Sequence, residues 1–320
     1  MNITTYQPAY LAEAAGLFVQ SFRRLRAAVP TLPNRFEQPE EVSRFLERLF
    51  SQCPGVFAFD HGRLAGYLGW YEADDFRGAN RRAAFVPVWA QAASPEGGRR
   101  VDQALYTAAA RQWLASDCEV HCLTLLADQA ERLQIWFWQG FGLAVVDAVR
   151  PVQPLNRAVP SGITIRRASL ADAPHLAEIE AEHAVHYAQP PVLMAPIPAN
   201  TPEEFETLLS QPSNTVWLAL DGEHTAGYLR LEMESFGAAA IVAAPDTIAI
   251  TGVYVRPAYR GRGIAASLLD AALRHYSALG FARCSVDFES FNPDAANFWP
   301  RYFQPVCFSL MRVPELGPGR

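Results

Sequence analysis

Lysine is absent from this chain of 320 residues, so all 27 of its basic residues are arginine. A chain without lysine cannot form a lysine Schiff base with a carbonyl substrate, which excludes that class of covalent catalysis. Long hydrophobic runs are absent too, since no apolar segment approaches the ~18 residues of a membrane-spanning helix. The start, MNITTYQPAY, lacks the basic and apolar stretches of a signal peptide. We therefore expect a cytoplasmic protein with no membrane partner.

The chain has few cysteines, and its net charge is negative. The five cysteines are scattered, and Cys118 and Cys122, the closest pair, have neither zinc nor redox spacing. We expect them to pack in a core under reducing conditions, and we expect no metal site. The formal charge of −6 and the lack of a basic tail argue against nucleic acid as a partner.

Two short sequences occur twice at the same spacing. Gly66-Tyr67-Leu68 returns 161 residues later as Gly227-Tyr228-Leu229, and Phe137-Trp138 returns as Phe298-Trp299. Around them, the predicted elements repeat in the order strand, two helices, hairpin, strand, long helix, strand and short aromatic helix. A repeat of this kind indicates a tandem duplication.

A proline-rich segment separates the two halves. Residues 151–160 contain three prolines, which suits a linker. We predict a first domain at 1–150 and a second at 161–320. Strands that alternate with helices favour an α/β (α+β) fold class, with a mixed sheet in each domain.

The segment RPAYRGRG, residues 256–263, joins a predicted strand to a predicted helix. The strand covers 247–255, and apolar residues at helical spacing begin at Ile264, with Gly280 closing the helix. Free amide groups and the positive end of the helix dipole meet at such a start. The segment is therefore a candidate anion site.

Four residues of this loop suit a phosphate group. Gly261 and Gly263 let the backbone approach an anion, and we place Gly263 in the first helical turn. Arg260 and Arg262 can add charge-assisted hydrogen bonds. The alternative is that the glycines only form a turn and the arginines are solvated. A Walker A loop is excluded, since Gly-Lys-Ser/Thr does not occur.

The residues that follow complete a family pattern. After Arg260-Gly261-Arg262-Gly263-Ile264-Ala265 come a predicted strand, then Asn292-Pro293-Asp294-Ala295 and Phe298-Trp299. In this order and spacing, residues 160–310 resemble the GNAT superfamily of acyl-CoA-dependent N-acetyltransferases, and 1–150 resemble it in architecture only. The resemblance implies two tandem GNAT-like domains. Each would be a mixed, mostly antiparallel, twisted sheet with a splayed parallel strand pair, flanked by helices.

The resemblance also implies acetyl-CoA as co-substrate. Its pyrophosphate would bind the amides of residues 261–265. Its pantetheine arm would pair with the main chain of Val253 and Val255 and contact Asn292. The implied cofactor-binding residues are Val253, Tyr254, Val255, Arg260, Gly261, Arg262, Gly263, Ile264, Ala265, Asn292 and Phe298.

The implied reaction is direct attack of an amine on the thioester, which needs a base. Asp287 and Glu289 are two apart on a predicted strand and share one face. Neighbouring carboxylates disfavour each other's ionisation, which suits a base near neutrality. The alternative is that one of them caps the next helix or is solvated. Glu232 and Glu234 are the next candidates.

The implied reaction also needs an oxyanion donor and an acid. The N–H group of Val253 is the candidate donor. Members of the family often protonate the thiolate with a tyrosine seven residues after the asparagine, where this chain has Trp299. We therefore assign the acid to Tyr302, one helical turn later.

The first half lacks these motifs. SPEGGRR stands in place of the phosphate loop, and Asp128 falls near the place of the asparagine. Thr124 and Leu126 stand where the second half has its two carboxylates. We therefore expect the first half to have lost acetyl-CoA binding, and we expect the aromatic residues of WFWQGF to pack in its core.

Two further segments have open interpretations. Glu182, His183 and His186 share a predicted helix, but without another spaced ligand they indicate metal only weakly. We expect the histidines to line the pocket of the acetyl acceptor. The proline-rich loop 187–202 is either a specificity lid or a plain connector.

The sequence thus predicts an N-acetyltransferase that transfers acetyl from acetyl-CoA to a primary amine of a small molecule or peptide. A non-catalytic acyl-CoA-binding sensor is the alternative from another class. An acetyltransferase like the mycothiol synthases, which also have two such domains, one of them silent, is a narrower alternative. We expect a monomer or homodimer.

Overall fold

The computed structural model describes residues 1–315 except 197, 234 and 236. The described chain forms two compact units. Unit 1 comprises residues 1–147, 239–241 and 304–315, and unit 2 comprises 148–238 and 242–303. Among the described residues, no helix is long and apolar enough to cross a membrane.

Unit 1 is built on two groups of strands. Its helices are α1 (Leu11–Ala28), α2 (Pro39–Phe50), α3 (Gly98–Ala115) and α4 (Ala130–Phe137). Its strands are β1 (Asn2–Thr5), β2 (Gly55–Asp60), β3 (Arg63–Gly69), β4 (Tyr71–Ala73), β5 (Ala83–Val86), β6 (Gln91–Ala93), β7 (Val120–Leu126) and β14 (Gln304–Arg312). One sheet has the order β1-β2-β3-β6, and β4, β5, β7 and β14 are neighbours in that order.

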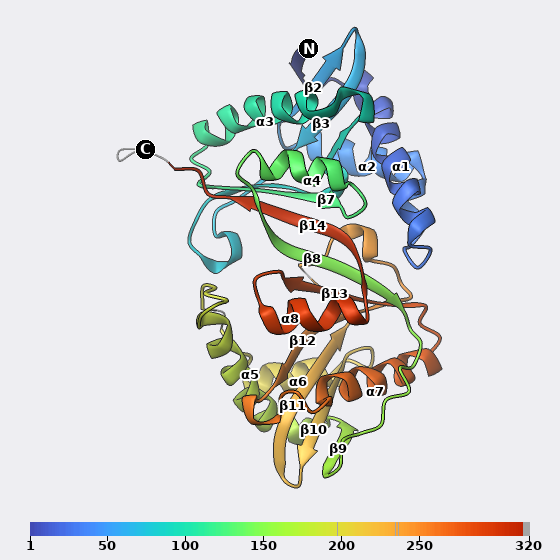
Figure 1. Ribbon diagram of the computed structural model, residues 1–320, viewed down its shortest axis with the longest axis vertical. Helices are drawn as coiled ribbons and strands as arrows, with labels where there is room; N and C mark the ends of the chain where they lie inside the picture. Colours follow the sequence, from blue (N-terminus) through green and yellow to red (C-terminus); the bar gives the residue numbers. More distant parts are fainter. Residues whose placement is uncertain (197, 234, 236, 316–320) are drawn as a thin grey trace. The chain divides into compact units, whose positions relative to one another are not determined.

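In helix α3 of unit 1, the spacing of the apolar residues explains which of its side chains are buried. Val101, Leu105, Ala109 and Trp113 are four apart, so they lie on one face of the helix. All four are buried, and the helix packs against β2 and β3 (Figure 1).

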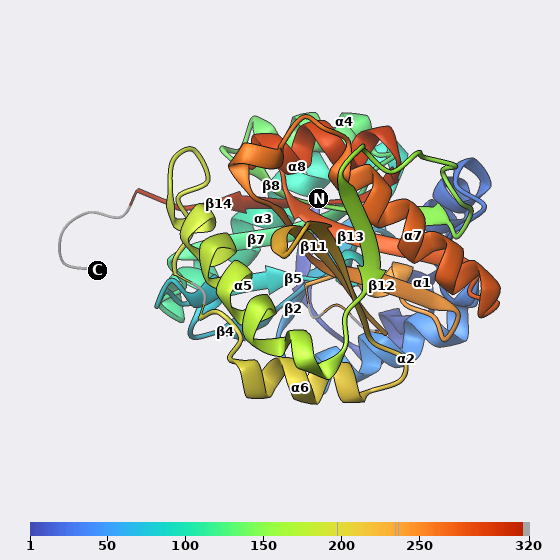
Figure 2. The same cartoon turned by 90° about the horizontal axis from the view of Figure 1, so that it is seen from below.

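Unit 2 contains one continuous run of strands. Its helices are α5 (Ala173–Ala188), α6 (Pro202–Ser210), α7 (Ile264–Ala278) and α8 (Pro293–Phe298). Its strands are β9 (Ile163–Arg167), β10 (Thr215–Asp221), β11 (His224–Glu232), β12 (Thr247–Val255) and β13 (Arg283–Glu289). They have the order β13-β12-β11-β10-β9, and only the pair β12–β13 in this run is parallel. Helices α5 and α7 lie on opposite sides of these strands (Figure 2).

Both units show the fold that the repeat predicts. Each contains a β-hairpin, a strand that pairs with the hairpin, and a parallel partner for the first part of that strand. In unit 1 that strand is broken into β5 and β6 by Pro87. The predicted mixed, mostly antiparallel sheet and the tandem arrangement are therefore confirmed.

The final strand, β14, belongs to unit 1, although the predicted domain ranges 1–150 and 161–320 assign it to the second domain. β14 pairs antiparallel with β7 of unit 1, with Leu310 opposite Leu123. Thr124 Oγ1 and Ser309 Oγ are 2.8 Å apart across this pair. Strand β8 (Gly142–Pro151) begins in unit 1 and ends in unit 2. The difference arises because local hydrophobic patterns predict a strand but not its partner.

The linker 151–160 is held in place by helix α7. The amides of Leu155 and Asn156 donate to Asp270 Oδ1 over 2.5 and 2.9 Å. Because Asp270 is 4% exposed, these hydrogen bonds anchor the predicted linker to the unit 2 core.

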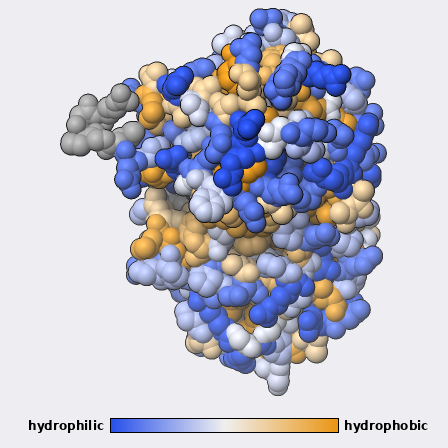
Figure 3. Space-filling model, turned by 45° about the horizontal axis from the view of Figure 1, so that its top comes forward, coloured by the Kyte–Doolittle hydropathy of each residue, from blue (hydrophilic) through white to orange (hydrophobic). Residues whose placement is uncertain are grey.

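The repeated Phe-Trp pair has different surroundings in the two units. Trp299 is 2% exposed, whereas Trp138 is 77% exposed. The prediction that the WFWQGF aromatics form core is therefore correct for Trp136 and Phe141, at 0% and 4% exposed, and wrong for Phe137 and Trp138, at 47% and 77% exposed. Hydrophilic side chains cover most of the face drawn in Figure 3, with hydrophobic ones in small groups between them.

Membership of β14 in unit 1 gives a testable prediction. Leu310 is 0% exposed, so Leu310→Ala should cost about 2–5 kcal/mol of unfolding free energy. Hydrogen exchange should accelerate in β7 and α3 of unit 1. The matched control is Leu273→Ala on α7, which is 1% exposed and should accelerate exchange in unit 2 instead. Faster exchange confined to unit 2 in Leu310→Ala would contradict the assignment.

Candidate active site

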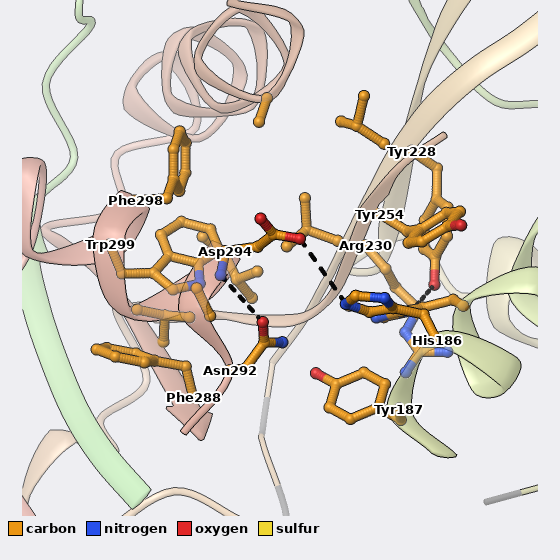
Figure 4. Close-up of a pocket in the computed structure, with 18 of the residues that line it drawn as sticks. His186, Tyr187, Tyr228, Arg230, Tyr254, Phe288, Asn292, Asp294, Phe298 and Trp299 are labelled. Carbon is orange, nitrogen blue, oxygen red and sulfur yellow. Dashed lines mark hydrogen bonds and ion pairs between the residues drawn. The ribbon is translucent and has the colours of Figure 1, made fainter. Parts of the chain in front are cut away.

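A cavity of about 590 Å³ lies within unit 2. Its walls come from α5 and the loop that follows it, from β11, β12 and β13, from the start of α7, and from α8 (Figure 4). Phe298, Trp299 and Asn292 lie on one side of the view, and Tyr187, Tyr228 and Arg230 lie on the other.

The cavity lies where β12 and β13 separate. Their parallel pairing ends at Ile250 and Val286, although the strands continue to Val255 and Glu289. A register shift on β11–β12 leaves Thr251 without a partner in the ladder. Such a bulge bends and twists a strand, which accounts for the separation. The predicted splayed pair is confirmed.

The open edge of β12 presents main-chain groups. The amide of Arg256 donates to Ala226 O, 3.0 Å away, so residue 256 faces β11. Because the facing direction alternates along a strand, Val255 and Val253 face away from β11, toward the side that β13 has left. Val255 O accepts a hydrogen bond from Arg260 Nε over 3.0 Å.

The loop before α7 has two left-handed glycines. Gly261 has φ +75° and Gly263 has φ +84°. Gly263 is the N-cap residue of α7 and is not in its first turn, which corrects the placement made from the sequence. The first turn of a helix leaves amides without intrahelical partners, so Ile264 and Ala265 present an anion site next to the cavity.

Arg260 and Asn292 connect this loop to α8. Arg260 Nη1 binds Asp294 Oδ2 at 2.8 Å, and its guanidinium lies 5.6 Å from the Tyr254 ring centre. Asn292 is the N-cap of α8, where its side-chain oxygen accepts from the Asp294 amide at 3.2 Å. His186 Nε2 lies 3.9 Å from Asp294 Oδ2 (Figure 4).

Arg262 is the one predicted cofactor residue from the loop whose side chain points elsewhere. Its guanidinium lies 5.5 Å from the ring centre of Tyr259, and it does not line the cavity. The other predicted cofactor residues, Val253, Tyr254, Val255, Arg260, Gly261, Gly263, Ile264, Ala265, Asn292 and Phe298, all line it.

The predicted catalytic residues also line this cavity. Asp287 Oδ1 accepts a hydrogen bond from Ser235 Oγ at 2.7 Å, and Glu289 lies at the end of the same strand. The Tyr302 ring lies 5.0 Å from that of Phe298 and beneath the guanidinium of Arg157 at 6.0 Å.

The two further candidates for the base are Glu232 and Glu234. Glu232 Oε1 accepts from Thr251 Oγ1 at 2.5 Å and pairs with Arg230 at 3.3 Å, so it is part of a hydrogen-bond network. Glu234 lies outside the described residues.

The sequence placed His183 and His186 in a pocket, and both line this cavity, but it missed the polar partners of His183. Tyr228 O–H donates to Glu180 Oε2 at 2.5 Å, and His183 Nδ1 lies 2.9 Å from the same hydroxyl. Arg230 Nη1 donates to Glu180 Oε1 at 3.2 Å. Tyr228 lies in the repeated Gly-Tyr-Leu motif, but nothing in the sequence pairs it with a helix 48 residues earlier.

Burial controls the charge of these groups. It is the main cause that lowers the pKa of His183 to about 3, and the charges of His186 and Arg230 act in the same direction. Burial and then Arg260 also lower the pKa of His186. Burial, followed by Glu180, raises the pKa of Tyr228 well above its usual range. Both histidines are therefore neutral near pH 7.

Comparison with known proteins agrees with this geometry. Residues 182–303 match the model of the acetyltransferase (GNAT) family. The match covers most of unit 2. No curated protein matches the chain.

Solved structures show the same fold over nearly the whole chain. A GCN5-related N-acetyltransferase from Sphaerobacter thermophilus is 18% identical, with a TM-score of 0.58 and coverage of 98% of this chain and 96% of that one. A GCN5-related glucosamine N-acetyltransferase region of a fungal multi-domain β-N-acetylglucosaminidase is 14% identical, with a TM-score of 0.55. There the alignment covers 97% of this chain and 38% of that one. The match of unit 2 to the GNAT family model supports acyl transfer as its general chemistry.

Unit 1 repeats the GNAT fold but fills the equivalent cleft. Leu68 pairs with Gln91 as Leu229 pairs with Val253, so Gln91 corresponds to Val253. The Gln91 side chain donates to Thr124 O at 3.0 Å, which ties β6 to β7. In unit 1, a side chain therefore bridges the gap that is open in unit 2.

Arg132 completes this filling. Its guanidinium makes two hydrogen bonds to Asp102, of 2.6 and 3.1 Å, and also binds Gln91 and Gln129 at 2.7 and 3.1 Å. Gln129 is the N-cap of α4, as Asn292 is of α8. Gln129, and not the predicted Asp128, is therefore the counterpart of the GNAT asparagine.

The phosphate loop itself is shortened in unit 1. The 3₁₀ turn Pro95–Gly97 leads directly into α3, whereas residues 260–263 separate the turn Pro257–Tyr259 from α7. The missing segment is the one that carries the two left-handed glycines. That the first half does not bind acetyl-CoA stays a prediction.

The buried pair in unit 1 gives a second prediction. Asp102 is 1% exposed, so Arg132→Ala leaves its carboxylate buried without its cation. We expect a loss of about 3–5 kcal/mol of unfolding free energy in unit 1. The matched control is Arg24→Ala, which removes the exposed pair with Asp128 and should cost less than about 1 kcal/mol. Hydrogen exchange of α3 and α4 measures both; equal effects would contradict the special role of Arg132.

Proposed function

We propose that unit 2 transfers an acetyl group from acetyl-CoA to a primary amine of a small molecule or peptide. The observation that carries the proposal is the continuity of three features in one cavity. They are the loop amides that suit a pyrophosphate, the open main-chain edge of β12, and a set of carboxylates on β13.

In this proposal, acetyl-CoA binds along β12. The amides of residues 261–265 hold the pyrophosphate, and Val253 and Val255 pair with the amides of pantetheine. Arg260 Nε now donates to Val255 O, so the cofactor displaces this hydrogen bond, and the guanidinium becomes available to phosphate. Asn292 and Phe298 line the path between the two strands.

The chemistry is a direct transfer. The nitrogen of the neutral amine attacks the thioester carbonyl carbon, and the Val253 N–H stabilises the oxyanion. Asp287 or Glu289 accepts the proton that the amine loses. The carbon–sulfur bond then breaks, and Tyr302 gives its proton to the thiolate. The products are the acetylated amine and CoA.

One observation favours the sensor alternative. The usual position of the tyrosine acid is Trp299, which is 2% exposed and has no acidic proton to give. Release of free thiol from acetyl-CoA in the presence of a panel of amines separates the two functions. An enzyme turns over, whereas a sensor binds acetyl-CoA and releases no thiol.

The loop gives a prediction for cofactor affinity. Gly263→Glu puts a carboxylate beside the pyrophosphate, where a like-charge contact costs ~1–4 kcal/mol at about 4 Å. With the lost amide bonds, affinity for acetyl-CoA should fall by at least roughly a hundredfold. Calorimetric titration measures it.

The positive φ of Gly263 requires a control for backbone strain. Gly280 follows the same helix with φ +83°, so Gly280→Glu carries the same strain, of about 1–2 kcal/mol, at the other end of α7. It should lose stability to a similar degree and keep its affinity for acetyl-CoA. Equal affinities in the two variants would mean that the loop is only a turn.

The base gives a prediction for pH dependence. Asp287→Asn and Glu289→Gln should each be tested, because either carboxylate is a candidate. The variant that lacks the base should lose at least about tenfold in kcat at neutral pH and less at high pH, where the amine is already deprotonated. Glu223→Gln, at an exposed hairpin turn, is the control and should keep the normal profile. Normal profiles in both variants would exclude this pair as the base.

A further inference from the structure

One side of the cavity is a wall from α5, the loop that follows it and β11, which we call the α5 wall. Its polar and aromatic side chains are Glu180, His183, His186, Tyr187, Tyr228 and Arg230. In Figure 4, the labelled residues of this wall face Asn292 and Phe298 on the opposite side. If acetyl-CoA lies along β12 and α8, the α5 wall faces the acetyl acceptor.

The positive charge of the α5 wall is already paired with carboxylates of the protein. Among the described residues of the α5 wall, Arg230 is the only arginine. It pairs with Glu180 at 3.2 Å and with Glu232 at 3.3 Å, so two carboxylates surround one guanidinium. Its Nε and Nη2 also donate to Thr251 at 3.0 Å. A carboxylate or phosphate on the acceptor would be a third anion around this single cation.

His183 adds no positive charge, and its tautomer is fixed. The one proton of the Tyr228 hydroxyl goes to Glu180, so that hydroxyl can only accept from His183. Nδ1 of His183 therefore carries the ring proton. Because the ring is neutral, Nε2 has a free lone pair on the edge away from Tyr228.

The rest of the wall is also suited to a hydrogen-bond donor or a cation. The ring centre of Tyr187 lies 4.8 Å from that of His183. Aromatic faces attract ammonium groups. Ser235, which lines the same cavity, donates to the carboxylate of Asp287.

We propose that the acceptor is an amine without a carboxylate or phosphate group, and that His183 Nε2 accepts a hydrogen bond from one of its N–H groups. Glu180 and Tyr228 act as positioning residues that keep the lone pair on Nε2. This inference rests on the proposed acetyl transfer, and it names the class of amine: simple amines, diamines and amides of amino acids are accepted, and free amino acids are rejected.

Matched substrates test the class of amine. Tyrosinamide and tyrosine have nearly the same size and differ in the carboxylate, and lysinamide and lysine form a second pair. Tyramine and 1,5-diaminopentane have neither the carboxylate nor the amide group. Thiol release from acetyl-CoA should give a kcat/KM at least about tenfold higher for the amide, which lacks the carboxylate, than for the acid in each pair. Equal values, or a preference for the acid, would overturn the proposal.

A binding measurement separates this inference from the proposed function. Saturation-transfer NMR with the same compounds and CoA reports contact without turnover. Contact by the amides but not the acids, together with no thiol release, would contradict acetyl transfer and support the inference. No contact by any of the compounds, while acetyl-CoA raises Tm, would contradict the inference and leave acetyl-CoA binding intact.

Variants of His183 test the hydrogen bond itself. His183→Phe should raise KM for the best amine at least about tenfold, with little change in kcat or in the Kd of acetyl-CoA. His183→Gln, which restores an acceptor oxygen, should recover part of this loss. His175→Gln, at an exposed position of the same helix, is the control. An unchanged KM in His183→Phe, with a normal circular dichroism spectrum, would overturn the role of His183.

Tyr228→Phe tests the positioning role. It removes the hydroxyl that holds the Nδ1 proton, so the tautomer is no longer fixed. We expect a higher KM and a changed ¹⁵N spectrum of the His183 ring, which packing alone would not alter. Wild-type nitrogen shifts would contradict the assignment of the tautomer.

Discussion

The site depends on the separation of two parallel strands, β12 and β13, partway along their length. Main-chain N–H and C=O groups inside a protein need partners, so strands that separate create a local demand for hydrogen bonds. In unit 2, β12 and β13 part after Ile250 and Val286, and the open edge of β12 borders a cavity. Arg260 provides a partner for Val255 there. A ligand that offers amides in an extended chain meets the same demand, which is why the opening suits a pantetheine arm.

Unit 1 meets the equivalent demand from within the chain. Gln91 reaches across to Thr124, and Arg132 holds Gln91 in place with Asp102 and Gln129. The result is a cleft bridged by the chain's own side chains. The duplicated fold thus has a filled cleft in unit 1 and an open one in unit 2, and a few side chains account for the difference. The loop before α3 is also shorter than the loop before α7.

The charges in the open cleft follow from burial. Taking an imidazole out of water disfavours its cationic form, so His183 is neutral and serves as a hydrogen-bond acceptor. The guanidinium of Arg230 remains charged, but Glu180 and Glu232 balance it. On the α5 wall, the one arginine among the described residues is therefore already paired. This is the physical basis for the proposed rejection of acidic acceptors.

The sequence alone determined the local features. The spacing of apolar residues gave α7 its start at Ile264, and the repeat at a constant offset indicated two related units. Glycines 261 and 263 marked the loop as a place where the backbone can approach an anion, and the structure then showed that both have positive φ. The motifs before and after the loop led to the cofactor residues and to Asp287 and Glu289, and all of these except Arg262 line one cavity.

Tertiary structure decided what local patterns do not encode. The pairing of β14 with β7 joins residues about 180 positions apart, and any apolar strand edge could have served. The bonds of Tyr228 with Glu180 and His183 depend on how a helix packs on a sheet. The helix and the strand are each predictable by periodicity, but their relative rotation is set by side-chain packing. That packing fixed the charge and tautomer of His183, and with them the character of the cavity wall.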